Sequence, residues 1–530
     1  MKAQKDPVKN GKLKVNIRMY CHGLGDCFLL TFTRGKEKFD MMIDCGLLQG
    51  TTAAKERMAI VADHIWKNSG GKLGTRDEKL PGKLDLVVVT HQHWDHISGF
   101  EQAQDVFDKI AFNEIWLGWT EDPNNELARN LNKGFNARLQ GVQQALGKLQ
   151  EFRLDAMHAQ VKELLEGFFG ENFGDVGDGS DKLGVDGKPK EPKSFRVKAW
   201  DYILTKDKPA RPKYTYCYPG TEPLTLNGFE GVRVYVLGPP RDPAKIRSLS
   251  PPPTEQYRHS FNLNTFSLED SFFVAVNDGA DEAQNNSCSP FDAKKSAVID
   301  EEVAKRESEK HYQFFQDYYF AEAGNSWRRI DDDWLSITSD LALKLDSYTN
   351  NTSLVLAIEL IESGKVLLFV GDAQSGNWQS WHDHTWEVPD KDGEKRKVNA
   401  EELLGRTVLY KVGHHGSHNA TLKKSGLEMM KKQNELVALI PVDTQKAHSK
   451  NPIWEMPFDL LLDDLLARTN GRVIASDTGL VKKKGATYPD WKGFKIDEEN
   501  LLKFTVEEKD EAKTKKAFEK PLFIDYEIEG

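Results

Sequence analysis

Short apolar runs that end in turn residues recur along the chain and predict an α/β fold. The clearest run, at residues 84–90, is almost continuously apolar, as expected of a strand buried on both faces. Comparable runs predict strands at 14–19, 27–32, 39–43, 115–117, 232–237, 353–360, 366–370, 408–412, 437–441, 472–475 and 522–528. Apolar positions at helical spacing predict helices at 51–67 and 457–468.

Other stretches break this alternation of strands and helices. Residues 126–169 place apolar side chains at helical spacing, as at Leu139 and Val142, and predict one or two long amphipathic helices. Residues 170–192, rich in Gly, Asp and Lys, predict a loop. Residues 507–520 predict a charged, solvated helix.

The composition fits a large folded protein with no general affinity for polyanions. The chain has 530 residues, of which 39 % are apolar, and it can bury a large core. Its 82 acidic and 72 basic residues give a net charge of −10, which provides no attraction to nucleic acid or anionic membrane. Only local basic patches would provide one.

Two segments have both a functional and a structural interpretation. Residues 182–213 hold ten Lys or Arg and four acidic residues, a local charge of +6. This basic segment would follow a phosphate backbone, or it is a solvated loop. The aromatic residues from Tyr312 to Phe320 would stack on bases, or they pack in a core.

The sequence shows no signal peptide and no membrane-spanning run, so we expect a cytoplasmic protein. The first 14 residues are polar and rich in lysine, and no run of 18 apolar residues occurs. The five cysteines show no Cys-x-x-Cys spacing and fit a reducing compartment.

The strongest chemical signal directly follows the run at 84–90. Three histidines and one aspartate, His91, His93, Asp95 and His96, fall within six residues. Imidazole nitrogen and carboxylate oxygen are ligands for Zn²⁺ and neighbouring first-row metals. Because side chains two residues apart on an extended segment point the same way, His91 and His93 would reach one ion. The other two would reach a second.

Two more apolar runs end in ligand-type residues. The run at 366–370 is followed by Gly371 and Asp372. The run at 408–412 is followed by the sequence Gly413-His414-His415-Gly416-Ser417-His418. Three such strand ends together predict a two-metal site at one edge of a sheet.

These motifs resemble the metallo-β-lactamase superfamily, whose diagnostic motif matches His-x-His-x-Asp-His at 91–96. More closely, the chain resembles the hydrolase domain of the competence protein ComEC and its stand-alone soluble relatives. The stretches that carry the closer resemblance are 23–27 (GLGDC), 42–46 (MIDCG), 236–240 (VLGPP), 350–356 (NNTSLVL), 371–372 (GD) and 414–417 (HHGS).

The resemblance implies an α/β fold of the αβ/βα four-layer sandwich type, with the metals at one edge. It also implies one catalytic domain that long, mostly helical or irregular insertions interrupt. The domain is expected at 12–480, its core at 12–100, 230–242 and 345–480, the insertions at 101–229 and 243–344, and a C-terminal extension at 481–530.

The resemblance also implies a role for each motif residue. The first ion would be bound by His91 and His93, the second by Asp95 and His96, and Asp372 would bridge both. His414 would complete the site, with His415 as the alternative ligand. The full set of implied metal ligands is His91, His93, Asp95, His96, Asp372 and His414.

Supporting residues follow from the same resemblance. Asp44 would orient the histidine motif from behind, and Asn350, Asn351 and Ser353 would lie next to the ligands. The superfamily's usual third-motif histidine falls where this chain has Asn350 and Asn351. The first ion therefore lacks one of its usual ligands.

A two-metal site of this kind would hold a hydroxide at neutral pH, with Zn²⁺ as the expected ion and Mn²⁺ as the alternative. Asp95 would accept or shuttle a proton, and His415 or His418 would donate one to the leaving oxygen. Ser417 and Lys411 are candidate substrate contacts, with a cap and a solvated charge as the alternatives.

The resulting interpretation is a metal-dependent hydrolase that cleaves phosphodiesters of nucleic acid or nucleotides. The basic segment 182–213 is the candidate contact for a nucleic-acid substrate. One alternative is a hydrolase of small esters, thioesters or lactones. Another is a partner-binding component of a multi-protein bacterial assembly, such as a defence system, with protein partners docked on the insertions.

Overall fold

The computed structural model describes most of the chain, which divides into two compact units. The first unit comprises residues 1–132, 165–260 and 346–530, and the second comprises 133–164 and 261–345. The described residues are 11–73, 79–151, 154–171, 194–248, 251–257, 338–389, 394–450, 453–483, 485, 487–489, 491–507 and 515–530. The aromatic group from Tyr312 to Phe320, residues 182–193 of the basic segment and nearly all of the loop expected at 170–192 lie outside them.

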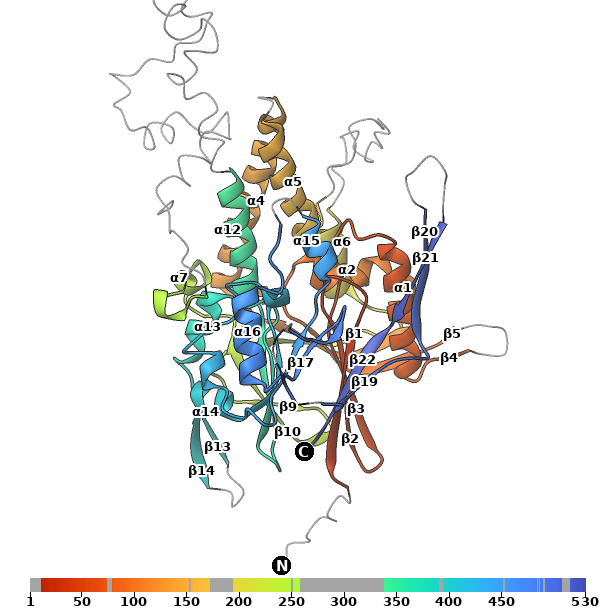
Figure 1. Ribbon diagram of the computed structural model, residues 1–530, viewed down its shortest axis with the longest axis vertical. Helices are drawn as coiled ribbons and strands as arrows, with labels where there is room; N and C mark the ends of the chain where they lie inside the picture. The colour runs from red at the N-terminus through yellow and green to blue at the C-terminus, as the bar shows by residue number, and fades with distance from the viewer. Residues whose placement is uncertain are drawn as a thin grey trace, which may run out of the picture. The chain divides into compact units, whose positions relative to one another are not determined.

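The first unit contains two large mixed sheets (Figure 1). In spatial order, the strands of the first sheet are β19 (Phe494–Ile496), β22 (Phe523–Glu529), β1 (Leu13–Tyr20), β2 (Cys27–Arg34), β3 (Glu37–Cys45), β6 (Gly82–Val89), β7 (Ile110–Gly118) and β8 (Lys213–Cys217). Strands β3, β6, β7 and β8 run parallel. Their carboxyl ends therefore lie at one edge of the sheet.

The second sheet has a parallel half as well. In spatial order, its strands are β18 (Gly479–Leu480), β17 (Val473–Ala475), β16 (Val437–Ile440), β15 (Thr407–Lys411), β12 (Lys365–Phe369), β11 (Val355–Leu360), β10 (Phe229–Gly238) and β9 (Leu224–Leu226). Strands β12, β15, β16 and β17 are parallel. The segments after β12 and β15 therefore leave the sheet at the same edge.

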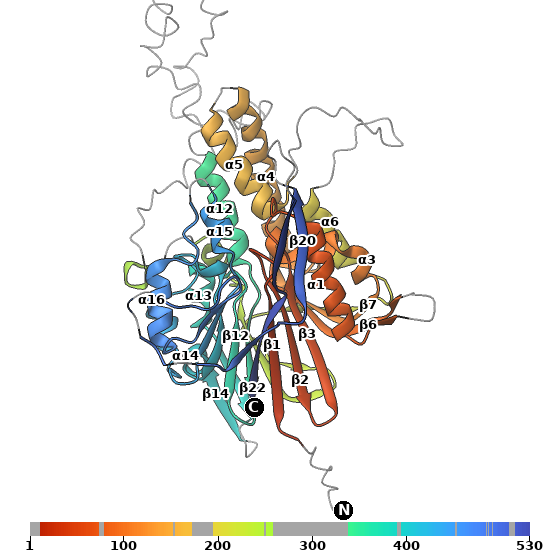
Figure 2. The same ribbon diagram turned by 45° about the vertical axis from the view of Figure 1, so that its right-hand side comes forward.

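Helices cover the outer faces of both sheets (Figure 2). Those on the first sheet are α1 (Ala54–Asn68), α2 (Trp94–Gln102), α3 (Gln104–Phe107) and α6 (Phe195–Thr205). Those on the second are α13 (Ser375–Trp381), α14 (Ala400–Gly405) and α16 (Asp459–Arg468). The layers run helix, sheet, sheet, helix, which confirms the αβ/βα sandwich expected from the sequence.

Shorter elements decorate this sandwich. Three two-stranded sheets are formed by β4 (Lys72–Leu73) with β5 (Lys79–Leu80), β13 (Thr385–Pro389) with β14 (Lys395–Asn399), and β20 (Leu501–Glu507) with β21 (Lys515–Pro521). Short helical segments are η1 (Trp119–Glu121), α7 (Pro243–Ile246), η2 (Pro253–Glu255), η6 (His414–Gly416), η7 (Leu427–Met429) and α15 (Thr444–His448).

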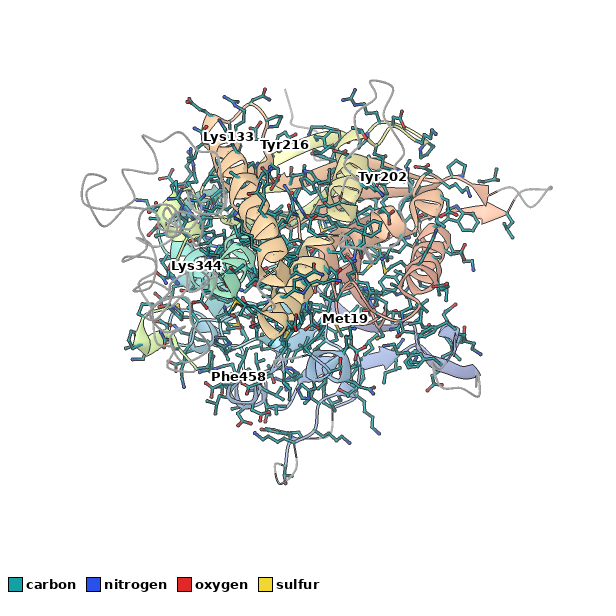
Figure 3. The ribbon with its side chains drawn as sticks, turned by 90° about the horizontal axis from the view of Figure 1, so that it is seen from above. Met19, Lys133, Tyr202, Tyr216, Lys344 and Phe458 are labelled. Atoms are coloured by element: carbon teal, nitrogen blue, oxygen red, sulfur yellow. The ribbon has the colours of Figure 1, made fainter. Side chains whose placement is uncertain are left out.

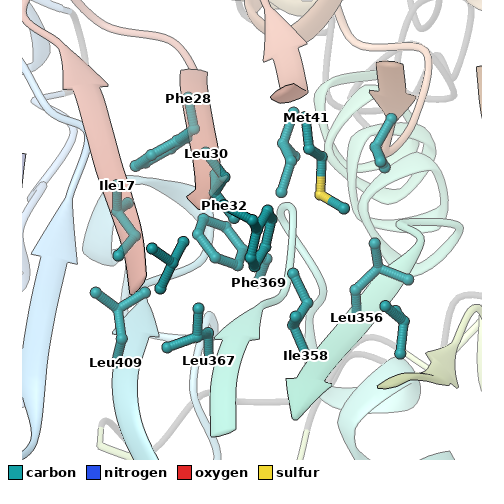
Figure 4. Close-up of a cluster of buried hydrophobic side chains, with 14 of the residues drawn as sticks. Ile17, Phe28, Leu30, Phe32, Met41, Leu356, Ile358, Leu367, Phe369 and Leu409 are labelled. Carbon is teal, nitrogen blue, oxygen red and sulfur yellow. The ribbon is translucent and has the colours of Figure 1, made fainter. Parts of the chain in front are cut away.

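The main core lies between the two sheets (Figure 4). Strands of the first sheet contribute Ile17 and Phe28, and strands of the second contribute Leu356 and Phe369. The rings of Phe28 and Phe369 meet edge to face, with centroids 5.6 Å apart. Alternate residues along β1 point into this core, which is the pattern of a strand with one buried face.

The second unit is described through three helices that also extend into the first. They are α4 (Glu126–Glu151), α5 (Asp155–Phe169) and α12 (Thr338–Asn351). The apolar positions expected to face a core on α4, including Leu139 and Val142, are buried. Among the helices that the structure describes, none has the length and apolar character needed to cross a bilayer.

The charged segment at 507–520 differs from its predicted helix. Its described parts belong to the hairpin of β20 and β21, in which Phe504 stacks on Phe518 with centroids 4.7 Å apart. The high content of Lys and Glu hid the two-residue alternation of a strand. The region expected as an extension, 481–530, supplies β19 and β22 to the first sheet, and β22 pairs with β1 along its length.

Removing the ring of Phe28 tests the core between the sheets. We expect Phe28→Ala to lower the free energy of unfolding by about 3–5 kcal/mol, because it leaves a cavity opposite Phe369. Urea denaturation followed by circular dichroism measures this change. Leu460→Ala, at a side chain that is 52 % exposed, is the control and should change the free energy by less than about 0.5 kcal/mol.

Candidate metal centre

The histidine motif begins where the buried strand β6 ends. His91 and His93 lie on the extended segment that follows the strand, and α2 starts at Trp94. Asp95 and His96 therefore occupy the first turn of that helix. Gly46 allows this turn to approach closely, because a β-carbon there would lie 2.3 Å from the backbone of Asp95. All four predicted ligands of the motif are buried.

The carboxylate of Asp44 holds this motif from behind. The Thr90 amide donates to Asp44 Oδ1 at 2.7 Å, and the Thr90 hydroxyl donates to Oδ2 at 2.6 Å. His96 Nδ1 donates to the same Oδ2 at 2.8 Å. This bond directs His96 Nε2 away from Asp44, as in metal sites where a carboxylate fixes the tautomer of a ligand histidine.

The second sheet brings Asp372 to the same place. Its amide donates to Ser353 Oγ at 3.1 Å, and its Oδ1 accepts from the His414 amide at 2.9 Å. Its Oδ2 lies 3.1 Å from His96 Nε2, a contact without hydrogen-bond geometry. Gly371, at φ +54°, makes the turn, and a β-carbon there would lie 2.9 Å from Thr90. The ends of β6 and β12 thus meet at one edge.

Each of the six residues implied as metal ligands has a buried side-chain atom without a hydrogen-bond partner among the described residues. These atoms are His91 Nε2, His93 Nδ1 and Nε2, Asp95 Oδ1, His96 Nε2, Asp372 Oδ2 and His414 Nε2. An unsatisfied buried polar atom costs about 1–3 kcal/mol. Such a concentration of nitrogen and oxygen lone pairs fits divalent metal ions, so these residues are able to hold them.

Three of these side chains form one compact group with His415. Ligand atoms of Asp95, His96, Asp372 and His415 all lie within 4.8 Å of one another. His415 Nε2 is 2.8 Å from Asp95 Oδ2, and its Nδ1 donates to the Pro441 carbonyl at 2.6 Å. By position, His415 therefore joins the residues implied for the second ion.

His414 occupies a different position from its neighbour. Its Nδ1 lies 3.2 Å from Gln374 Nε2 and 2.8 Å from Ser417 Oγ, and no described residue forms a hydrogen bond with its Nε2. Its ring lies 6.1 Å from that of Phe168. Burial lowers the pKa of His414 to about 4, so the ring is neutral at neutral pH.

His91 and His93 form the other part of the centre. Their ring centroids are 4.8 Å apart, and Phe168 and Phe169 flank His93. Burial lowers the pKa of His93 to about 3 and moves that of His91 well below its usual range. Both imidazoles are therefore neutral at neutral pH, which is the form that binds metal.

Near the ligands, reasoning from the sequence missed a role for Asp26 and wrongly expected Lys411 to contact substrate or solvent. The Lys411 ammonium contacts Asp26 Oδ2 at 2.5 Å and Asp372 Oδ1 at 3.2 Å. Although burial lowers it, the pKa of Lys411 is raised overall by these carboxylates. Lys411 is 1 % exposed, so it neutralises carboxylates inside the protein rather than facing a substrate. The signal for Asp26 was its place in the GLGDC stretch.

The remaining predicted residues lie in different surroundings. Ser353 Oγ is 3.3 Å from His91 Nδ1, and Asn350 is fully buried. The side-chain amide of Asn351 donates to the carbonyls of Ile246 and Ser248, so Asn351 connects α12 to the segment that contains these two residues. His418 is exposed, and its ring lies 6.0 Å from that of Phe458, labelled in Figure 3.

The described part of the basic segment packs against the first sheet's helices. Arg196, on α6, is buried and donates at 2.7 Å to Oε1 of Gln92, the residue between His91 and His93. Gln92 in turn donates to Glu121 at 2.6 Å. Tyr202, labelled in Figure 3, donates to Asp108 at 3.1 Å. The contacts of Gln92 with Arg196 and Glu121 hold the histidine motif in place.

The fold is an αβ/βα sandwich of the metallo-β-lactamase type, and its group of histidines and aspartates at a sheet edge is of the kind that metal-dependent hydrolases use. Residues 23–114, which include β2, β3, β6 and the whole histidine motif, match the family model of the metallo-beta-lactamase superfamily. A search of curated proteins found no match to the chain.

Asp44→Asn tests whether the carboxylate behind the motif positions the metal ligands. We expect the affinity for Zn²⁺ to fall by about 10–100-fold, because His96 loses the acceptor that fixes its tautomer. Competition with a chromophoric chelator measures this affinity. Asp105→Asn, at an exposed position on α3, is the control. An unchanged affinity for Zn²⁺ in Asp44→Asn would show that the Asp44 carboxylate has no part in metal binding.

Proposed function

We propose that this protein is a phosphodiester hydrolase that uses two divalent ions, Zn²⁺ or Mn²⁺. The observation that carries the proposal is the set of seven buried ligand atoms, on six residues, that have no hydrogen-bond partner among the described residues and lie where the ends of the two sheets meet. Two-metal sites are a common solution for hydrolysing phosphate esters. The resemblance to the ComEC hydrolase domain motivates the choice of a phosphodiester.

His91 and His93 would hold the first ion in this proposal. Asp95, His96 and His415 would hold the second, and Asp372 would bridge the two. We choose His415 over His414 because its Nε2 lies within the compact ligand group. When bound, the ions lower the pKa of water and neutralise charge that develops on the substrate oxygens.

His414 would then contact the substrate. Gln374 Nε2 is placed to donate to His414 Nδ1, and in the tautomer that accepts this bond the ring proton lies on Nε2, which has no partner among the described residues. A hydrogen bond from this Nε2 to a phosphate oxygen or to the leaving oxygen would stabilise the charge that accumulates there. Asp95, through its unpaired Oδ1, would accept a proton from the attacking water.

The surroundings of the histidines favour a slender substrate such as a nucleotide or a single strand. The six implied ligands are between 0 and 6 % exposed, which restricts approach. Phe168, next to His93, stacks on the half-buried Trp454 with centroids 4.9 Å apart. An aromatic surface at this position suits a base beside the scissile phosphate.

Hydrolysis of a small ester, thioester or lactone is the second candidate. The same burial of the ligands favours it, and so does the net charge of −10, which opposes the approach of a polyanion.

A comparison of substrates separates the two candidates. With Mn²⁺ or Zn²⁺, we expect purified protein to cleave bis-p-nitrophenyl phosphate and labelled single-stranded DNA or RNA faster than duplex DNA, p-nitrophenyl acetate or a lactone. Asp372→Ala should lower kcat/KM by at least about 100-fold, because the bridging carboxylate is lost. Asp383→Ala, at a side chain 60 % exposed, is the control. Preferential cleavage of the ester or lactone would overturn the leading proposal.

Separate alanine variants decide the roles of the two neighbouring histidines. We expect His415→Ala to lose one of two bound ions, and His414→Ala to keep both while kcat falls by about 10²–10³-fold. Elemental analysis after gel filtration counts the ions, and steady-state kinetics give kcat. The reverse pattern, with an ion lost from His414→Ala alone, would contradict the assignment.

A further inference from the structure

The proposed first ion has only two imidazole ligands from the motifs. The superfamily's usual third-motif position falls at Asn350 and Asn351, at the end of α12. A carboxamide is a poor replacement for imidazole at a zinc site, where sulfur, imidazole and carboxylate ligands predominate. Another side chain near His91 and His93 would have to complete the site.

Asp346, one helical turn before Asn350, lies in the required place. It is 5 % exposed, and its Oδ1 has no hydrogen-bond partner among the described residues. This oxygen is 3.7 Å from His93 Nε2, which is also unpartnered. Two ligands at about 2.0–2.1 Å from a tetrahedral ion are separated by about 3.3 Å, so the observed spacing needs little adjustment.

The contact between Asp346 and His93 is not a hydrogen bond that merely orients the ring. At 3.7 Å it exceeds the usual limit for an N–H···O bond. His93 has both ring nitrogens unpartnered, so no neighbour in the described structure fixes its tautomer. A shared ion between the two atoms accounts for both observations.

Asn350 holds Asp346 in this orientation. Its Nδ2 donates to Asp346 Oδ2 at 3.2 Å, and residues four apart lie on the same face of a helix. The bond occupies one carboxylate oxygen and leaves Oδ1 directed at His93. Asn350 would thus orient the carboxylate of Asp346 and would not bind the ion itself.

The charge of Asp346 also calls for a cation. Asp346 is buried, and the negative charges of Asp95 and Asp372 act on it. An ionised carboxylate in such surroundings is stable only when it is paired or coordinates a metal. A divalent ion beside His93 supplies that positive charge.

We propose that Asp346 is the third protein ligand of the first ion, in place of the superfamily's third-motif histidine. The inference rests on the proposed two-metal centre and adds a ligand to it. The first site becomes a set of two histidines and one carboxylate, a combination found in catalytic zinc sites that keep one position open for water or substrate. The extra carboxylate also makes the site more suitable for Mn²⁺ than three imidazoles would.

Asp346→Asn tests this assignment, because it removes the charge and keeps the shape. We expect the metal-loaded wild type to retain two ions per chain after gel filtration and Asp346→Asn to retain one, as counted by elemental analysis. The visible spectrum of the Co²⁺-loaded variant should lose the bands of one site. The matched control is Asp340→Asn, at an exposed position on the same helix, which should retain both ions.

Asn350→Ala separates a ligand from an orienting residue. It should retain two ions, with an affinity for the weaker ion lowered by about 10–100-fold, the usual effect of losing an outer partner. The loss in Asp346→Asn should be larger. Melting of the metal-free proteins by circular dichroism shows that each variant folds, and Asp346→Asn should be at least as stable as the wild type because a buried charge is removed.

Two outcomes would overturn the inference and are distinguishable. Two ions with wild-type affinity in Asp346→Asn would exclude Asp346 as a ligand and leave the proposed function intact. Wild-type protein that binds no divalent ion would remove the metal centre itself, and the inference with it.

Discussion

Seven polar side-chain atoms, on six residues, are buried without a hydrogen-bond partner among the described residues at the place where the two sheets of the sandwich meet. Burial of such atoms is unfavourable, yet several structural elements bring them together. The end of β6 delivers His91 and His93, the first turn of α2 delivers Asp95 and His96, and the turn after β12 delivers Asp372. Metal binding at this place would offset the unfavourable burial of these atoms, and the surrounding structure holds their side chains in position.

The support for the ligands comes from buried charges on both sheets. Asp44 fixes the histidine motif from the first sheet, and Lys411 neutralises Asp372 and Asp26 from the second. Both are almost completely buried, so neither contributes to the surface on which the net charge of −10 acts. The acidic composition therefore says little about the electric field at the site, which is set by the balance between these carboxylates and Lys411 and, in the proposed centre, by its two ions.

Most of the sandwich and most of the candidate site could be predicted from the sequence. Strands with buried faces appear in it as apolar runs, and the predicted ligand residues directly follow these runs. Asp346 could not be found in this way. It lies within a helix, it follows no apolar strand, and its relation to His93 appears only when distant segments fold together. The hairpin of β20 and β21 was missed for a different reason, since charged side chains on a strand exposed to water obscure its alternation. For Lys411, a single lysine in an apolar run gave no sign that its ammonium would be buried.

The most direct test of the account is a crystal structure of the protein soaked with Mn²⁺, with anomalous data collected near the manganese absorption edge. The account predicts two anomalous peaks about 3.5–4 Å apart, between the ends of β6 and β12, with Asp372 touching both and Asp346 touching the one beside His93. Well-ordered density for these side chains with no anomalous peak among them would contradict the central claim.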